Sequence, residues 1–401
     1  MAHLPDAPVP SSLSALTAEG ALAQQKNSGS FVTEFFEDGV PDFAIAALDR
    51  IHGSLYASMR HLVLCGAHRP APCAWVCYQH GEISSVLLFR IESASLLVLS
   101  EMVLLSAAQV NAFARSVFQR YRSVKQIRFH AVCLGSEALE FCSQRIDFSE
   151  NYILDLPGTV TQYWSSLGKA TRKTIKTYGN KLQRDFPDFS WRACRADELP
   201  LTLQQSLVQQ LQAFKQASMA ARNKVAAVDA AETTRMLQLA AESGLFGIAT
   251  INGETHAGSL ACRIGDSYVM WLSAADPALE HYRLGLLVCY WSVCDCIAAG
   301  GRQSHLLWGR YQYKTQLGAV RYPMSQLCVN RSVWQFLRMP MQTLKMTFAR
   351  QRFVWRSWLL YDVHESTDSM SRCIARAVRW VQANRKRRLA TLPQSDAALR
   401  R

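Results

Sequence analysis

Apolar and polar residues alternate along this chain in a way that predicts two successive α/β units. The first unit opens with a helix over 41–64, in which apolar residues recur every four positions. His80-Gly81-Glu82 lies between two short apolar runs and indicates a hairpin turn. The predicted strands of this unit lie at 74–79, 83–90, 95–99 and 126–132, and a second helix is predicted at 107–121.

The second unit repeats the order of hairpin, strand, helix and strand. Asn252-Gly253 and Gly265-Asp266 are tight-turn pairs between apolar runs, and Gly300-Gly301 is typical of a helix end. The predicted strands lie at 151–156, 245–251, 256–264, 267–273, 305–308 and 319–329, and the predicted helices at 169–184, 202–222, 229–242 and 286–299. We therefore expect an α/β (α+β) fold with two similar domains, each a mixed, mostly antiparallel sheet flanked by helices.

Length and composition divide the chain into four segments. Residues 1–40 form a weakly patterned lead-in, 41–150 and 151–335 are the two predicted domains, and 336–401 are a basic helical tail. The chain contains no apolar run of the roughly 18 residues that a membrane-spanning helix needs. The start of the chain lacks the basic and apolar regions of a secretory signal. These features predict a cytoplasmic protein.

Charge is concentrated near the end of the chain. The formal net charge is +13, and residues 341–401 hold 13 Lys/Arg against 4 Asp/Glu, or +9, which leaves +4 for the rest. The low charge of the remainder argues against a nucleic-acid partner. The tail is either a contact for a partner protein or for the inner membrane surface, or a solvated helical face. Cys294 and Cys296 point to different sides of a predicted helix and cannot share a metal, so no metal site is predicted.

The junction before the helix at 286–299 is the first candidate site. Backbone N–H groups at a helix start attract phosphate, and a glycine there lets a ligand approach closely. The predicted contacts for a pyrophosphate are Arg283, Leu284 and Gly285. The alternative is an ordinary helix start with an exposed arginine.

The segment 308–314 is the second candidate site, because it gathers aromatic, glycine and cationic residues after a predicted buried strand. Lys314 is a candidate for binding an anion or a developing oxyanion, with Tyr313 beside it. Trp308 and Arg310 are candidate substrate-binding residues. The alternative is a surface lysine beside structural tyrosines.

Three further features complete the candidate set. The helix at 169–184 carries a basic face, on which Arg172 and Lys173 are candidate contacts for phosphates or for a charged acceptor; a solvated helix is the alternative. His256, on a predicted strand, and Asp276, in the loop before Arg283, are candidate general bases. A structural histidine and a loop-shaping carboxylate are the alternatives.

Three blocks of the sequence resemble one branch of a known superfamily. They are LDLPGTVTQYWSSLGKATRKTIKTYGNKLQRDF, the stretch from LFGIATINGETHAGSL to CDCIAAGG, and HLLWGRYQYKTQLGA. Their order and spacing resemble the FemAB-like, CelD/BcsL-type branch of the GNAT N-acetyltransferases. Gly309, Tyr313, Lys314 and Gly318 match that branch's Gly-x-x-x-Tyr-Lys-x-x-x-Gly ending.

The resemblance implies tandem GNAT-like domains and direct acyl transfer to an amine or hydroxyl. It implies acetyl-CoA or another acyl-CoA as donor, with its phosphates on the backbone of 283–287 and Tyr313 and Lys314 at the acceptor or donor anion. The implied acceptor is a small molecule or a saccharide, for example an envelope or exopolysaccharide component. Two departures stand out: the phosphate motif keeps one glycine, and 305–308 lack the branch's usual aspartate. Two alternatives are a non-catalytic partner-binding protein and a transferase that uses aminoacyl-tRNA.

Overall fold

The computed structural model describes residues 31–221 and 230–337. Residues 31–145 and 149–337 form one compact body, which contains both of the predicted units. The predicted basic tail lies outside the described residues except at its first two positions, and the first thirty residues of the predicted lead-in also lie outside them. None of the helices in the described ranges is long and apolar enough to cross a bilayer.

The described residues form strands and helices in the following order. The strands are β1 (Val32–Phe36), β2 (Cys73–Gln79), β3 (Glu82–Glu92), β4 (Ser95–Val98), β5 (Val103–Leu105), β6 (Gln126–Leu134), β7 (Ser143–Asp155), β8 (Ser190–Arg195), β9 (Gly244–Ile251), β10 (Glu254–Ile264), β11 (Ser267–Ala275), β12 (Gln303–Leu307) and β13 (Val320–Asn330). The α-helices are α2 (Asp42–His52), α3 (Met59–Leu64), α4 (Ala107–Arg120), α5 (Val160–Ser166), α6 (Lys169–Asp185), α7 (Leu201–Ala221), α8 (Ala230–Ser243), α9 (Leu284–Ala298), α10 (Gln312–Gln316) and α11 (Val333–Leu337). Short 3-10 helices lie at η1 (Leu55–Ala57), η2 (Ala196–Glu198) and η3 (Pro277–Tyr282).

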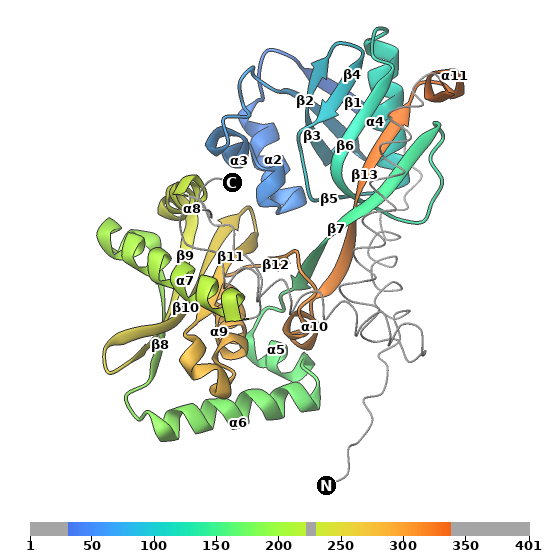
Figure 1. The fold of residues 1–401 in the computed structure, drawn as a ribbon. Helices are drawn as coiled ribbons and strands as arrows, with labels where there is room; N and C mark the ends of the chain where they lie inside the picture. Colours follow the sequence, from blue (N-terminus) through green and yellow to red (C-terminus); the bar gives the residue numbers. More distant parts are fainter. Residues whose placement is uncertain (1–30, 222–229, 338–401) are drawn as a thin grey trace, which may run out of the picture. The chain divides into compact units, whose positions relative to one another are not determined.

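All thirteen strands of the described chain belong to one mixed sheet (Figure 1). Its order is β1-β2-β3-β4-β6-β13-β7-β12-β11-β10-β9-β8, with β5 beside β6. Most of the pairs are antiparallel, whereas β4 and β5 run parallel to β6 and β11 runs parallel to β12. This confirms the predicted fold class, a mostly antiparallel sheet flanked by helices. The two predicted sheets are joined, because β13 from the end of the second unit pairs with β6 of the first.

The predicted boundary between the two units, at residue 150, falls inside β7. β7 pairs with β12 of the second unit and is the neighbour of β13 in the sheet. β7 therefore comes from the start of the second unit and β13 from its end, although the two strands are neighbours at the centre of the sheet. The division into domains stays a prediction.

The predicted continuous helix over 41–64 is wrong. α2 ends at His52, and Gly53 takes the left-handed conformation with φ 53°. A side chain at Gly53 would overlap that of Ser267 in β11. The backbone therefore has to turn here, and α3 starts anew after Ser58, whose hydroxyl accepts the N–H of His61.

Three strands were not predicted: β1, the three-residue β5, and β8. β1 and β8 occupy the ends of the sheet, where β1 pairs only with β2 and β8 only with β9. Most of their residues keep some exposure to solvent, so neither strand needs the regular alternation of apolar residues that marks a buried strand. That is why a pattern of hydrophobic positions does not reveal them.

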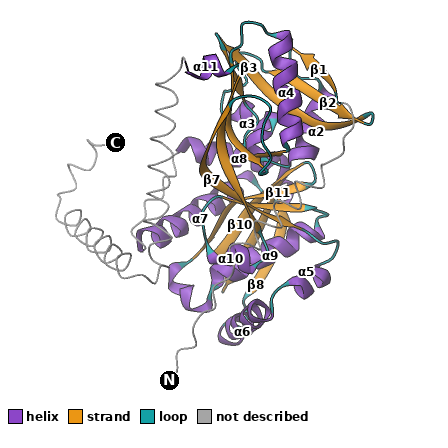
Figure 2. Cartoon of the chain, turned by 90° about the vertical axis from the view of Figure 1, so that its right-hand side faces the viewer, coloured by secondary structure: helices purple, strands orange, loops and turns teal. Residues whose placement is uncertain are grey.

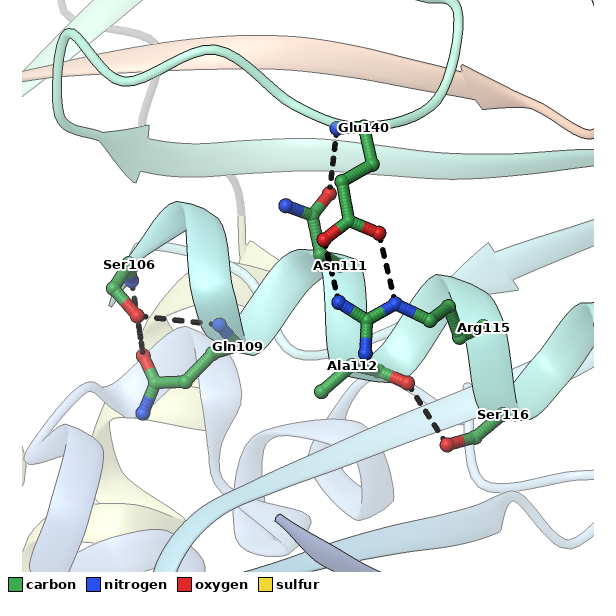
Figure 3. A network of polar contacts seen from close by, with 7 residues as sticks. All are labelled: Ser106, Gln109, Asn111, Ala112, Arg115, Ser116 and Glu140. Carbon is green, nitrogen blue, oxygen red and sulfur yellow. Dashed lines mark hydrogen bonds and ion pairs between the residues drawn. The ribbon is translucent and has the colours of Figure 1, made fainter. Parts of the chain in front are cut away.

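A capping box fixes the start of α4 (Figure 3). The Ser106 hydroxyl accepts the N–H of Gln109 at 3.2 Å, and the Gln109 side chain accepts the N–H of Ser106 at 2.9 Å. Further along the helix, Asn111 accepts the N–H of Glu140 at 3.0 Å, and Arg115 donates to the Glu140 carboxylate. These contacts hold the loop after β6 against the helix.

Helices cover both faces of the first half of the sheet. Trp75 of β2 packs in one core cluster with Phe113 of α4, and the rings lie 5.1 Å apart. The next residue, Val76, points to the other face and packs with Ala44 and Leu48 of α2. The alternation of successive side chains along a strand thus sets the two layers.

The same alternation places the helices of the second half. Gly258 of β10 faces Leu211 of α7, since a side chain at Gly258 would meet the Leu211 Cδ2 atom at 3.3 Å. The next residue, Ser259, hydrogen-bonds to Ser292 of α9. α9 also contacts α5 and α6, so α7 and α8 cover one face and α5, α6 and α9 the other (Figures 1 and 2). The predicted helix 286–299 is confirmed as α9, which begins two residues earlier.

Asp295 links α9 to the edge strand β8 and gives a test of these packing contacts. Its carboxylate accepts the indole N–H of Trp191 at 2.9 Å, and burial raises the pKa of Asp295 from 3.8 to about 6. The folded state therefore binds this proton more tightly than the unfolded state does. The charge costs stability above pH 6, and this cost disappears as the pH falls toward 4.

We expect Asp295→Asn to raise the free energy of unfolding at pH 8 and to leave it unchanged at pH 4, because the amide oxygen still accepts the Trp191 N–H. Urea unfolding at both pH values measures the difference. Glu254→Gln, at an exposed carboxylate, is the control and should change neither value. A difference of the same size at pH 4 and pH 8 would contradict the assignment.

Candidate functional site

β11 and β12 separate soon after they begin. Their parallel ladder consists of the pairs from Ser267–Gln303 to Val269–His305, although β11 continues to Ala275. A bulge accompanies the separation, because Leu260 and Ala261 of β10 pair with Leu272 and Met270 and leave Trp271 unpaired. Open α/β sheets bind ligands beyond the carboxyl ends of their parallel strands. The carboxyl end of β11 leads through η3 into α9.

The start of α9 carries backbone N–H groups that no other group of the described chain engages. Arg283 is the N-cap in the left-handed conformation, and its carbonyl accepts the N–H groups of Leu286 and Leu287. Within the described residues the N–H groups of Leu284 and Gly285 have no hydrogen-bond partner. Leu284 and Leu287 are buried and anchor the helix, whereas Gly285 is exposed and a side chain there would meet nothing within 4 Å. The five predicted phosphate contacts therefore lie together at the start of α9, with Arg283 and Gly285 exposed and Leu286 half-buried.

Two cations, Arg283 itself and one lysine of α6, lie at this helix start. The Arg283 guanidinium lies over the ring of Tyr178 of α6, 5.4 Å from its centroid. The Lys181 ammonium of α6 lies 4.7 Å from the ring centroid of Tyr282, whose hydroxyl donates to Asp185 at 2.9 Å. These contacts fix the second half of α6 against the α9 start. They add positive charge where the α9 dipole is already positive.

Arg172 and Lys173 lie farther along the same helix. Nine residues separate Arg172 from Lys181, which is about 13 Å along a helix axis. Arg172 is half-buried and Lys173 is exposed. The structure therefore places these two predicted residues on the surface that leads away from the α9 start.

Lys314 is buried, with 1% of its surface exposed, and its ammonium holds the end of β12. It donates to the carbonyls of Leu307 at 3.0 Å and Trp308 at 2.6 Å, and it lies 4.9 Å from the ring centroid of Tyr152. Leu307 itself has a positive φ of 58°, which a branched side chain seldom adopts. Burial lowers the pKa of Lys314 to about 8. These contacts make Lys314 a positioning residue for the chain between β12 and α10.

Tyr313 points toward α9 and a thiol that the sequence analysis did not single out. It hydrogen-bonds to Cys289, whose Sγ lies 3.4 Å from the Ser273 hydroxyl of β11. Burial raises the pKa of Cys289 and of Tyr313, so both groups stay protonated and neutral. A buried neutral thiol is a poor nucleophile, and the cluster therefore forms a polar lining beside β11.

Arg310 is engaged inside the protein. Its Nε atom donates to Glu150 of β7 at 3.0 Å, and the carboxylate of Glu150 also lies 3.7 Å from Arg321. Only 13% of the Glu150 side chain is exposed. The sequence analysis missed Glu150, because nothing local connects it with a loop 160 residues later. Glu150 brings a carboxylate to the 308–314 segment, where 305–308 have none.

His256 and Asp276 form a pair. The His256 Nδ1 atom lies 3.1 Å from Asp276, and the backbone N–H of Asp276 donates to the His256 carbonyl at 2.8 Å. The other Asp276 oxygen accepts the N–H of Ala278 and so caps η3. Asp276 lies five residues beyond the Trp271 bulge, about 16 Å along a strand. The pair therefore shapes the loop that leads to Arg283.

Trp308 is exposed, with 52% of its surface accessible to solvent. Its ring lies 5.6 Å from that of Tyr56 in the first half of the chain. Tyr56 lines a pocket of about 260 Å³ together with His61, Glu101 and His130. His130 contacts Glu101 at 3.2 Å, and this hydrogen bond raises the pKa of His130. Trp308 thus contacts, through Tyr56, a pocket whose lining combines apolar residues with a few titratable groups.

Comparison with known proteins supports an acyltransferase domain in the second unit. Residues 169–315 match the family model of an acetyltransferase (GNAT) domain. This range extends from the start of α6 into α10 and contains α9 and the separating strands. No curated protein matches the chain.

Several solved structures are similar to the chain. The crystal structure of FemX covers 73% of this chain and 96% of its own, at 9% identity and a TM-score of 0.49. A conserved protein of unknown function from Bacteroides thetaiotaomicron covers 74% and 99%, at 11% identity and a TM-score of 0.45. A tandem GNAT protein from the clavulanic acid biosynthesis pathway covers 74% and 98%, at 10% identity and a TM-score of 0.34.

The buried contacts of Lys314 give the test of this site's architecture. We expect Lys314→Met to lower the free energy of unfolding by about 1–2 kcal/mol, because it removes the donor of the Leu307 and Trp308 carbonyls while it also removes a desolvated charge. Urea unfolding at pH 7 measures the change. Lys176→Met, at an exposed lysine of α6, is the control. Equal stability of the two variants would show that the Lys314 contacts carry no net stabilisation.

Proposed function

We propose that this chain is an acyltransferase that takes its acyl group from acetyl-CoA or a related acyl-CoA. The match of residues 169–315 to a GNAT domain supports acyl transfer in general. The main support for an acyl-CoA donor is the start of α9, where two N–H groups without partners, an exposed glycine and the Arg283 side chain lie together. An anionic diphosphate suits such a helix start, because the aligned backbone donors and the helix dipole both favour negative charge.

The rest of the donor molecule would lie where β11 and β12 separate. A diphosphate on Leu284 and Gly285 leaves the pantetheine arm to run along β11 toward the Trp271 bulge. There the unpaired edge of β11 offers backbone hydrogen-bond groups, and Ser273 offers a hydroxyl. The thioester would then lie beside the chain segment that Lys314 holds in place.

The reaction would be a direct transfer. The amine or hydroxyl of the acceptor attacks the thioester carbonyl, a C–N or C–O bond forms, and the C–S bond breaks to release the CoA thiol. The acceptor proton passes to water or to the departing sulfur. Holding the two reactants together can lower the barrier by roughly 7–11 kcal/mol, so the proposal assigns no side chain as an indispensable base. His256 and Asp276 shape the donor loop in this proposal.

The acceptor would bind near Trp308. An exposed indole offers a flat apolar surface with one polar edge, which suits the face of a sugar ring as well as other small molecules. The pocket behind Tyr56 supplies polar groups within the same region. We therefore favour a saccharide or another small molecule that carries a nucleophilic amine or hydroxyl.

Gly285 provides the sharpest test of the donor site. We expect Gly285→Leu to weaken the binding of CoA and acetyl-CoA at least tenfold in isothermal titration, because its side chain would occupy the space in front of the N–H groups. Its melting temperature should stay close to that of the wild type, since the new side chain meets no neighbour within 4 Å. Gly158→Leu is the matched control, at an exposed glycine before α5 whose side chain would meet only Gln162 at 3.8 Å.

Three outcomes would contradict the proposal. The wild type could fail to bind CoA at high micromolar concentration, or Gly285→Leu could bind as tightly as the wild type. The wild type could also transfer from aminoacyl-tRNA and not from acyl-CoA in a donor competition, which would select the aminoacyl alternative. Binding of CoA without release of free thiol across a panel of amino sugars and other amines would favour the partner-binding alternative.

A further inference from the structure

A second cavity lies far from the α9 start. It has a volume of about 720 Å³ and is bordered by α2 and α3 on one side and by the β10–β11 turn, α8 and η2 on the other. Ala299, just after the last residue of α9, is among its lining residues. Fifteen residues of helix separate Ala299 from Leu284, or about 22 Å. The cavity is therefore a different place from the proposed donor site, and its volume lies in the range of small-molecule sites.

A buried carboxylate without a full set of partners lines this cavity. Asp49 of α2 is 9% exposed, and its Oδ1 atom is buried without a hydrogen-bond partner among the described residues. Buried polar atoms in folded proteins almost always have partners, and exceptions call for a reason. Burial raises the pKa of Asp49, while the nearby charge of Arg60 opposes this effect. A ligand that donates a hydrogen bond here would supply the missing interaction.

Arginines with unused donors line the same cavity. Arg60 lies 3.9 Å from Glu242, and Arg263 lies 3.9 Å from Asp266 while its Nε atom donates to the Gly265 carbonyl at 3.0 Å. A guanidinium carries five N–H donors, so these contacts engage only part of each group. Arg195, by contrast, is held by Asp197 in a two-point ion pair. Arg60 and Arg263 are therefore the groups that can bind an anion in the cavity.

We propose that this cavity binds a small zwitterion of the amino-acid type, with its ammonium on Asp49 and its carboxylate on Arg60 and Arg263. An anion alone would leave the Asp49 oxygen without a donor, and a cation alone would meet two arginines. The lining also contains Glu242, so positive and negative groups are both present around the space. A molecule that carries both charges offers a partner to the carboxylate and to the arginines. The inference is independent of the donor site at α9.

Binding in this place would join segments that are distant in the sequence. Asp49 and Arg60 come from the first unit, and Arg263 ends β10 just before the turn into β11. A side chain at Gly265 in that turn would contact the backbone of Asp49, so the two segments already lie against each other. A ligand that bridges them stabilises the folded chain by mass action and should raise its melting temperature.

The experiment uses the full chain with L-serine, L-glutamate and L-lysine at 10 mM as probes in thermal-shift and titration measurements. Acetate and ethylamine at the same concentration are the single-charge controls. We expect at least one amino acid to raise the melting temperature by several degrees, and neither single-charge compound to do so. The Gly285→Leu variant should respond as the wild type does, which separates this site from the donor site.

Variants of Asp49 and Arg263 test which residues bind the ammonium and the carboxylate of the amino acid. Asp49→Asn and Arg263→Gln should each weaken the binding of the amino acid at least tenfold. Asp295→Asn and Arg115→Gln, at a half-buried carboxylate and an ion-paired arginine outside the cavity, should leave it unchanged. The proposal is overturned if no amino acid shifts the melting temperature. It is also overturned if acetate alone matches the amino acids, or if Arg263→Gln and Asp49→Asn bind as the wild type does.

Discussion

The candidate site depends on the early end of the ladder between β11 and β12. Only the residues from Ser267 to Val269 pair with β12, so the second half of β11 has one bonded edge instead of two. An unpaired edge inside a sheet is unfavourable unless other groups keep the strands apart. The Trp271 bulge bends β11, and the buried Lys314 ammonium binds the carbonyls at the end of β12. The bulge and the Lys314 hydrogen bonds therefore keep the two strands apart.

The start of α9 is held in place by its own buried residues. Leu284 and Leu287 are buried and fix the helix, while Arg283 and Gly285 are exposed. The positive charges of Lys181 and Arg283 are held by the rings of Tyr282 and Tyr178. Aromatic faces orient these cations without neutralising them, so the region keeps its positive potential.

Local sequence signals predicted the elements that local interactions determine. The Asn252-Gly253 and Gly265-Asp266 turns located the hairpins of β9, β10 and β11, because these residues accept the positive φ that such turns require. The edge strands β1 and β8 and the break at Gly53 depend on neighbours from distant parts of the chain. The pattern of apolar and polar residues within these segments contains no information about those neighbours.

The candidate site residues also fall into two groups, those that local sequence predicts and those that depend on the folded sheet. The exposed backbone at Gly285 follows from a strand-to-helix junction and was predicted from the sequence. The His256–Asp276 pair needs the exact register, since without the bulge at Trp271 His256 would lie opposite Ala275. The burial of Lys314 and the partnership of Arg310 with Glu150 require the folded sheet, and the sequence therefore suggested solvent-facing roles for both residues.

The position of β13 has a consequence for how the chain folds as it is made. β6 lacks its neighbour on one side until residues 320–330 have left the ribosome, because these residues supply β13. At synthesis rates of about 5–20 residues per second, β6 waits roughly 10–40 s for that partner. During this interval the nascent first half carries an open strand edge, which is the kind of surface that chaperones cover and that associates with other chains. Completion of the sheet is thus coupled to completion of nearly the whole described polypeptide.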